Sequence, residues 1–282
     1  MKKVLLATSI LAASAGFAAA EVAVSGSARM GLFYDGYDTY FSSRVRIVFT
    51  ASGETDGGLS FGASMRADQD GGNGNDAGDD TSNTNMEDAT VYVSGAFGKL
   101  TFGDVDSAAQ ALVGHVSAVG FTGLGSYNEV GYFGSNPKTA MLYEYSTGAL
   151  TFALGAGQLG SDAYSVAVKY STDAFSVALG YEDEGFGFDD QTLSLGGSAT
   201  FGAATVKAVV LDSDRSSDTD FALSVDYVAG AATVTAFYAS HSDIYAGKNG
   251  EYVGIGASYD LGGGAAVKGG IVSLDGDETI AD

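Results

Sequence analysis

Residues 41–50 read Phe-Ser-Ser-Arg-Val-Arg-Ile-Val-Phe-Thr, and this stretch decides the class of fold. Phe41, Val45, Ile47 and Phe49 alternate with Ser42, Arg44, Arg46 and Thr50, so an extended chain places the two sets on opposite faces. The same alternation recurs in residues 22–32 and 59–68. An amphipathic helix would repeat every 3.6 residues instead. The pattern therefore predicts β-strands with one apolar face and one small or polar face.

Tight turns, most of them containing glycine, separate these segments on one side of the array. They are expected near residues 57–58, 97–98, 148, 172–173, 202, 230 and 262–264. The alternate connections are longer and polar, at residues 35–39, 69–86, 106–137, 157–162, 183–190, 212–218, 241–250 and 275–278. Seven short turns and eight loops define sixteen antiparallel strands.

The direction in which the apolar face points, towards an interior core or towards the outside, distinguishes a soluble β-sandwich from a membrane β-barrel. A soluble sandwich also alternates, but a bilayer-spanning barrel needs an apolar exterior, a polar interior and a closed sheet with every backbone group paired. Short turns on one rim and long loops on the other are typical of such barrels. Tyrosines recur towards strand ends, where a ring with one wet edge suits the membrane interface. We therefore expect a transmembrane antiparallel β-barrel of sixteen strands.

The first twenty residues have the pattern of a secretory signal peptide. Lys2 and Lys3 precede an apolar stretch, and a run of alanines ends at Ala20. Residues 21–282 contain no linker-like segment and are expected to form a single barrel domain. Residues 278–282 provide only about half a strand, so the sixteenth strand is expected to be incomplete.

Composition limits the chemistry and the partners. The chain contains no cysteine, which excludes disulfides and thiolate metal sites. Its net charge of −22 makes nucleic acid an improbable partner because both would be anionic.

Three segments resemble a known family: EVAVSGSARMG at residues 21–31, GKLTFGDVD at 98–106 and YVAGAATV at 227–234. They are similar to general diffusion porins of Gram-negative bacteria, especially the alphaproteobacterial group. The resemblance covers the whole chain after residue 20. It implies a homotrimer in outer-membrane lipid, whose sixteen-stranded barrels pass ions and small hydrophilic solutes by passive diffusion. It also implies that the third loop folds into the pore and narrows it.

The third loop is expected at residues 106–137. Its first part, residues 107–128, contains no Asp, Glu, Lys or Arg, and Ser107 is a suitable N-cap for a short helix over residues 107–113. A long loop in a regular array of hairpins is usually functional or disordered, and the functional interpretation is favoured here. The acidic residues expected near the constriction are Asp104, Asp106 and Glu129.

Four of the five arginines occur on the first three expected strands. They are Arg29, Arg44, Arg46 and Arg66, and all four fall on the small or polar face. Because adjacent strands lie about 4.8 Å apart, these side chains are expected to form one positive patch on the lumen wall. Facing acidic loop residues, they would set a transverse field that orients dipolar solutes. The alternative is that each arginine merely faces water.

The most acidic stretch, residues 68–80, offers closely spaced oxygens on a glycine-rich backbone. Such oxygens can bind calcium, and the candidate ligands are Asp68, Asp70, Asp76, Asp79 and Asp80. A solvated loop, or a contact with a neighbouring subunit, is the alternative. No cofactor is expected to be required.

Catalysis has little support in the sequence. His115 and His241 are the only histidines, and each stands alone in an expected loop without a nucleophile or a metal-ligand pattern. We therefore expect a channel rather than an enzyme. The alternatives are a substrate-selective channel and an exported β-rich adhesin or calcium-binding surface protein. A selective sugar channel usually has a line of aromatics in its lumen, and an adhesin needs no apolar outer face, so general diffusion is favoured.

Overall fold

The computed structural model describes residues 21–71, 84–133, 140–185, 190–216, 218–241, 250–276 and 278–282. The expected signal peptide, residues 1–20, lies outside them. The described residues form sixteen β-strands, one α-helix and one 3-10 helix. These are β1 Glu21–Tyr34, β2 Thr39–Glu54, β3 Ser60–Gly71, β4 Thr84–Gly95, β5 Gly98–Gly103, α1 Ala108–Val113, η2 Leu124–Ser126, β6 Ala140–Thr147, β7 Leu150–Ala156, β8 Tyr164–Ser171, β9 Phe175–Asp183, β10 Gln191–Phe201, β11 Ala204–Ser213, β12 Asp220–Ala229, β13 Ala232–His241, β14 Gly250–Gly262, β15 Ala265–Leu274 and β16 Glu278–Ala281.

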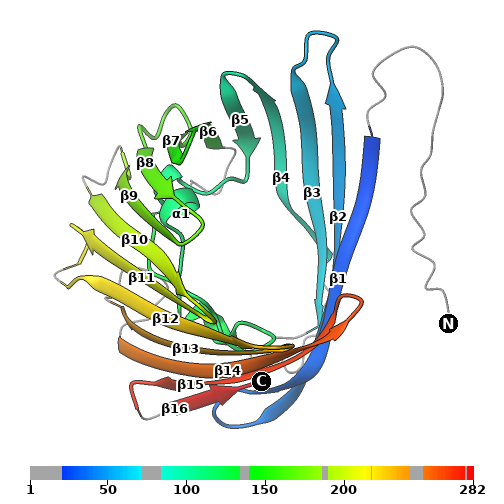
Figure 1. Ribbon diagram of the computed structural model, residues 1–282, viewed down its shortest axis with the longest axis vertical. Coiled ribbons are helices and arrows are strands. Elements are labelled where there is room, and N and C mark those ends of the chain that lie inside the picture. Colours follow the sequence, from blue (N-terminus) through cyan, green and yellow to red (C-terminus); the bar gives the residue numbers. More distant parts are fainter. Residues whose placement is uncertain are drawn as a thin grey trace.

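Each strand pairs with its sequence neighbours in antiparallel fashion, and β1 pairs with β16 to close the barrel (Figure 1). The final strand is only four residues long, and its pairing with β1 is at Tyr34 and Ala281. The sixteen-stranded closed barrel expected from the alternating pattern is therefore confirmed.

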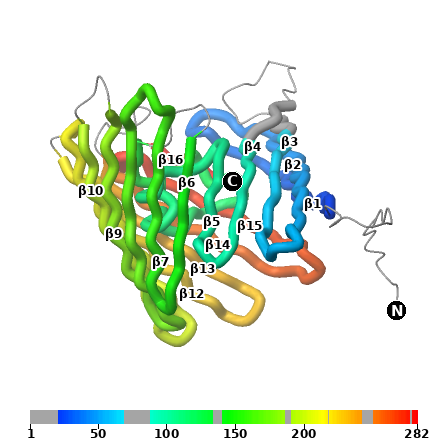
Figure 2. Tube along the Cα trace, turned by 90° about the horizontal axis from the view of Figure 1, so that it is seen from above, coloured from blue at the N-terminus to red at the C-terminus, as the bar shows by residue number. Residues whose placement is uncertain are grey.

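The turns follow the expected division between two rims. All seven short turns lie where the sequence predicts them, and Figure 2 shows tight turns gathered at one end of the barrel. Gly148, Gly202 and Gly230 have φ values of 58°, 62° and 64°. A β-carbon is strained in this left-handed region, which explains glycine at these sites.

The second loop was predicted too long. It was expected at residues 69–86, but β3 continues to Gly71 and β4 begins at Thr84. Gln69 is paired with both Val45 and Thr84, so the backbone ladder continues through this polar segment. Backbone pairing does not depend on side-chain polarity, and the alternation of apolar residues therefore misses the strand ends.

Apolar side chains cover the outside of the barrel. Met30 and Phe41 are 88% and 87% exposed, and valine, leucine and isoleucine side chains are exposed on strands all around the ring. A surface of this kind is unfavourable in water but suits the hydrocarbon core of a bilayer, where a closed sheet leaves no backbone edge to be satisfied. The outer face is therefore the lipid face.

Among the described residues, no helix has the length and apolar character required to cross a membrane.

The buried core lies inside the barrel rather than between two sheets. Val116, Val119 and Leu124 from the connection between β5 and β6 pack with inward side chains such as Leu211 and Val272. A second cluster joins Ala108 and Leu112 of α1 to β6, β7 and β8. The third loop is thus an integral part of the packed structure.

The assignment of faces predicts different costs for a charge at two positions on β2. Ile47→Lys places an ammonium group on the outer face near the middle of the strand, and we expect it to lower the free energy of unfolding in lipid vesicles by about 2–4 kcal/mol. Thr50→Lys, on the inner face between Ala23 and Ser64, is the control and should change it little. Urea unfolding followed by circular dichroism measures both. Equal destabilisation by the two variants would contradict the assignment.

Candidate functional site

The third loop enters the barrel through a capped helix. Ser107 accepts a hydrogen bond from the Gln110 amide at 3.0 Å through its Oγ, and α1 follows directly. The helix expected after a Ser107 cap is therefore present. Figure 1 shows α1 on the inner side of the wall near β7, β8 and β9.

Small residues allow this helix to lie against the wall. The Ala108 amide donates to Ser165 Oγ on β8 at 2.8 Å. A β-carbon placed on Gly180 of β9 would come within 2.6 Å of the Ala109 β-carbon, a distance too short for ordinary contact. Glycine at position 180 is therefore required by the close approach of α1 to the sheet.

Beyond α1 the loop follows the inner wall. The Ser117 amide donates to Ser224 Oγ at 3.0 Å, and Ser117 Oγ donates to Asp226 Oδ2 at 2.6 Å. Lys207 Nζ donates to the same Ser117 hydroxyl at 2.9 Å. This network fixes the loop to β11 and β12. These strands come next along the wall after β7–β10, which α1 contacts.

The loop then reaches β1, on the far side of the inner wall from α1. Phe121 packs against Gly31 of β1, where a β-carbon would meet its ring at 2.6 Å. Arg29 NH1 donates to the carbonyl oxygens of Phe121 and Thr122, both at 3.2 Å. The loop thus extends along the inner wall from β7 to β1.

The returning part of the loop is also attached to the wall and to the outgoing part. The ring of Tyr127 stacks on Tyr252 of β14 at 4.6 Å between centroids. Asn128 Nδ2 donates to the Val116 carbonyl at 2.7 Å, and the Phe133 amide donates to Glu182 Oε2 at 3.4 Å. Hydrogen bonds at several points therefore hold the loop in a single path.

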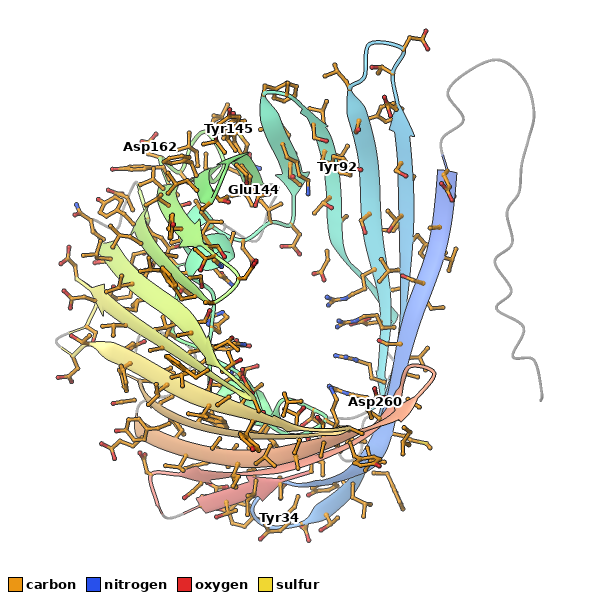
Figure 3. The ribbon with its side chains drawn as sticks, in the orientation of Figure 1. Tyr34, Tyr92, Glu144, Tyr145, Asp162 and Asp260 are labelled. Carbon is orange, nitrogen blue, oxygen red and sulfur yellow. The ribbon has the colours of Figure 1, made fainter. Side chains whose placement is uncertain are left out.

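The four predicted arginines lie on neighbouring strands of the wall. Arg29 on β1 is directly opposite Arg44 on β2. Arg46 forms a bidentate contact with Asp68, with Nε–Oδ1 and NH2–Oδ2 distances of 2.9 and 2.8 Å. Figure 3 shows side chains with nitrogen ends projecting into the open centre from the β1–β3 wall. We call these four residues the arginine wall.

Two acidic residues that the sequence analysis did not assign to this site accompany the arginine wall. Arg66 Nε lies 3.0 Å from Asp68 Oδ2, and Arg66 NH1 also pairs with Asp88 of β4. Asp88 has a φ of 52° at a register shift between β3 and β4, a backbone feature that the sequence pattern does not reveal. Arg46 and Arg66 are thus held in place by carboxylates within the same wall.

The three predicted acidic residues lie at the start of the loop and on its returning part. The Asp104 amide donates to the Ala89 carbonyl of β4 at 3.0 Å, and Asp106 lies next to the helix cap. Glu129 lies between the buried residues Asn128 and Val130, while its own side chain is exposed. The side chains of Asp104 and Asp106 are exposed as well.

Asp106 has an altered acidity. The surrounding lumen wall removes part of the hydration of its carboxylate and raises its pKa; His115 acts in the opposite direction, and Asp104 and Glu129 raise the pKa further. These effects place His115 and all three predicted acids within one electrostatic environment. A negative region at the loop and a positive region on β1–β3 therefore border the same lumen.

The calcium prediction is only partly covered by the structure. Asp68 contacts Arg46 and Arg66, as described above. The Asp70 side chain and Asp76, Asp79 and Asp80 lie outside the described parts of the chain. Within the described residues, no group of three or more His, Asp and Glu side chains is arranged to hold a metal ion. The calcium site stays a prediction.

A closed sixteen-stranded barrel with an apolar exterior, a charged lumen and an inserted loop defines a transmembrane channel of the porin class. The family model for Gram-negative porins matches residues 7–279. The chain therefore belongs to the Gram-negative porin family, and it is an outer-membrane porin for passive diffusion.

Individual relatives agree with this assignment. The chain is 38% identical to a porin of Rhodobacter capsulatus over 90% of this chain and 95% of that one. It is 30% identical to a porin of Fuscovulum blasticum over 93% and 98% of the two chains. A porin structure refined at 1.8 Å resolution superposes with a TM-score of 0.76 at 35% identity, over 93% and 98% of the two chains. A mutant of Rh. blastica porin gives 0.76 at 26% identity, over 93% and 97%.

The environment of Asp106 predicts a pH effect on ion preference. Because the pKa of Asp106 is raised, its carboxylate takes up a proton at a higher pH than an ordinary aspartate does. The lumen loses one negative charge when this happens. The preference for cations should therefore begin to fall at a higher pH in the wild type than in Asp106→Asn. The zero-current potential in a KCl gradient, measured across pH, tests this. Asp162→Asn on another loop should keep the wild-type onset, and coincident curves for wild type and Asp106→Asn would contradict the prediction.

Proposed function

We propose that loop 104–133 narrows the pore and forms a constriction with the arginine wall, through which ions and small hydrophilic solutes diffuse. The observation that carries this proposal is the path of the loop along the inner wall from β7 to β1, where the loop contacts Arg29 before it returns. A loop attached in this way occupies lumen space that the barrel alone would leave open.

The charges support a transverse field across this constriction. The arginine wall lies on β1–β3. Glu129 follows Tyr127 by two residues, and Tyr127 contacts Tyr252 of β14 and His241 of β13 on another part of the ring. A field of this kind aligns the dipoles of polar solutes and disfavours apolar ones, because apolar molecules must displace oriented water without compensation. The proposed channel is thus a general one for hydrophilic solutes.

We also propose a non-catalytic role and a homotrimer. Both histidines are engaged in packing: His115 meets Tyr132 edge-on, and His241 Nε2 lies 2.9 Å from the Tyr127 carbonyl. The trimer is supported by membership of the porin family and by the resemblance to general diffusion porins. In a planar bilayer, one inserted particle should then close in three equal conductance steps, and closure in a single step would contradict the trimer.

The arginine wall predicts the direction of ion selectivity. In the double variant Arg44→Ala and Arg46→Ala, two positive charges are lost and Asp68 loses its bidentate partner. The permeability ratio of cations to anions should rise about twofold to fivefold, since a unit charge a few ångströms away in water contributes up to about 1 kcal/mol. The zero-current potential under a KCl gradient measures this ratio.

The matched control is Arg215→Ala, because this fifth arginine pairs with Glu184 and Asp190 at the loop rim. It should change the ratio much less than the double variant does. An unchanged potential in the double variant, with normal conductance, would refute the proposed field.

A further inference from the structure

A second basic region lies beneath α1, on the side of the short-turn rim. The inner-face residues Lys169, Ser176, Ser198 and Lys207 occupy β8, β9, β10 and β11 in order. Ser176 is opposite Ser198, and Ser198 is opposite Lys207. Since adjacent strands are about 4.8 Å apart, three strand spacings separate the lysine backbones by about 14 Å. Two flexible lysines can therefore converge on one small ligand between them.

These residues line a cavity of about 240 Å³ between the wall and the end of α1. Val113, Gly114 and His115 of the third loop form its roof, and Gly196 and Gly197 widen its floor. The two serine hydroxyls are hydrogen-bonded to each other at 2.9 Å. Positive charge, hydroxyl donors and a partly enclosed space thus meet at one place.

The two lysines lie at the floor of the cavity, whereas the acids that act on its roof residue His115 are Glu129 and Asp106 of the third loop. In the described part of the chain, Lys169 forms no ion pair and is half-buried. Lys207 donates to Ser117, and the nearest carboxylate in this network, Asp226, is already bonded to Ser117 and Thr235. Asp226 and Lys268 line the adjacent cavity instead. The region between Lys169 and Lys207 therefore favours an anion.

We propose that this cavity is a binding subsite for the phosphate group of small solutes, located between the constriction and the short-turn rim. Lysine ammonium groups bind phosphate as point charges, and serine hydroxyls donate to its oxygens. In the outer membrane the short-turn rim faces the periplasm, so solutes that have passed the constriction would reach this subsite on leaving the pore. The inference rests on the proposed channel function and adds a class of solute to it.

The test measures chloride current through single channels while inorganic phosphate is added at constant ionic strength and pH 7.5. The wild type should show a saturable reduction of current, reached at lower concentration when phosphate is added on the short-turn side. The double variant Lys169→Ser and Lys207→Ser should raise the half-saturating concentration about fivefold or more, since two charged contacts are lost. A non-saturable response, or one without sidedness in the wild type, would overturn the proposal.

The matched control is the double variant Lys99→Ser and Lys268→Ser, which removes the same charge from two other inward positions near this rim. It should keep the wild-type half-saturating concentration. An equal rise of the half-saturating concentration in both double variants would mean that phosphate responds only to the overall charge of the lumen, and it would overturn the subsite.

Two further measurements identify the preferred phosphate compound and distinguish failure of the subsite from failure of the channel. Inorganic phosphate and glucose 6-phosphate are compared, and the compound with the lower half-saturating concentration is the preferred solute. Acetate, added to give the same concentration of negative charge as phosphate, should cause no saturable reduction of current. A reduction equal to that caused by phosphate would overturn the proposal. Normal KCl conductance without a phosphate effect refutes the subsite alone, whereas absence of conductance from inserted protein refutes the channel.

Discussion

The need to pair every backbone N–H and C=O group away from water governs this structure. Inside a bilayer, an unpaired group costs several kcal/mol, and only a closed sheet or a helix avoids this cost. The sixteen strands meet most of this requirement by pairing with their neighbours around a ring, which closes where Tyr34 of β1 pairs with Ala281 of β16. Closure then fixes the alternation of side chains, because each residue must face either lipid or lumen.

The same constraint explains how the third loop can lie inside the barrel. Its backbone leaves the sheet, so its polar groups need other partners. Wall side chains provide them: Ser165 and Ser224 accept from loop amides, and Arg29 donates to loop carbonyls. Small residues on both surfaces, such as Ala109 and Gly180, permit the close approach that makes these bonds possible. The loop and the wall therefore form a single packed unit that shapes the lumen.

Strand number and turn position could be predicted because they depend on local alternation and on glycine. The path of the third loop could not, because glycine and alanine beneath α1 look the same in sequence as small residues facing an open lumen. Asp68 illustrates a second limit. Its acidic, glycine-rich context predicts a calcium ligand and does not reveal that the extended β2–β3 ladder places it directly opposite Arg46. Lys169 and Lys207 are 38 positions apart in the numbering and share a cavity only because the register aligns four strands.

The central claim is that the third loop is fixed against the inner wall, and disulfide cross-linking tests it most directly. The chain has no native cysteine, so Ser117→Cys with Ser224→Cys introduces one defined pair at a site of loop–wall contact. The account predicts that mild oxidation in native membranes links this pair, with conductance unchanged. Ser117→Cys with Ser64→Cys, on the arginine-bearing wall, should not cross-link. Failure of the first pair, or efficient cross-linking of the second, would contradict the account.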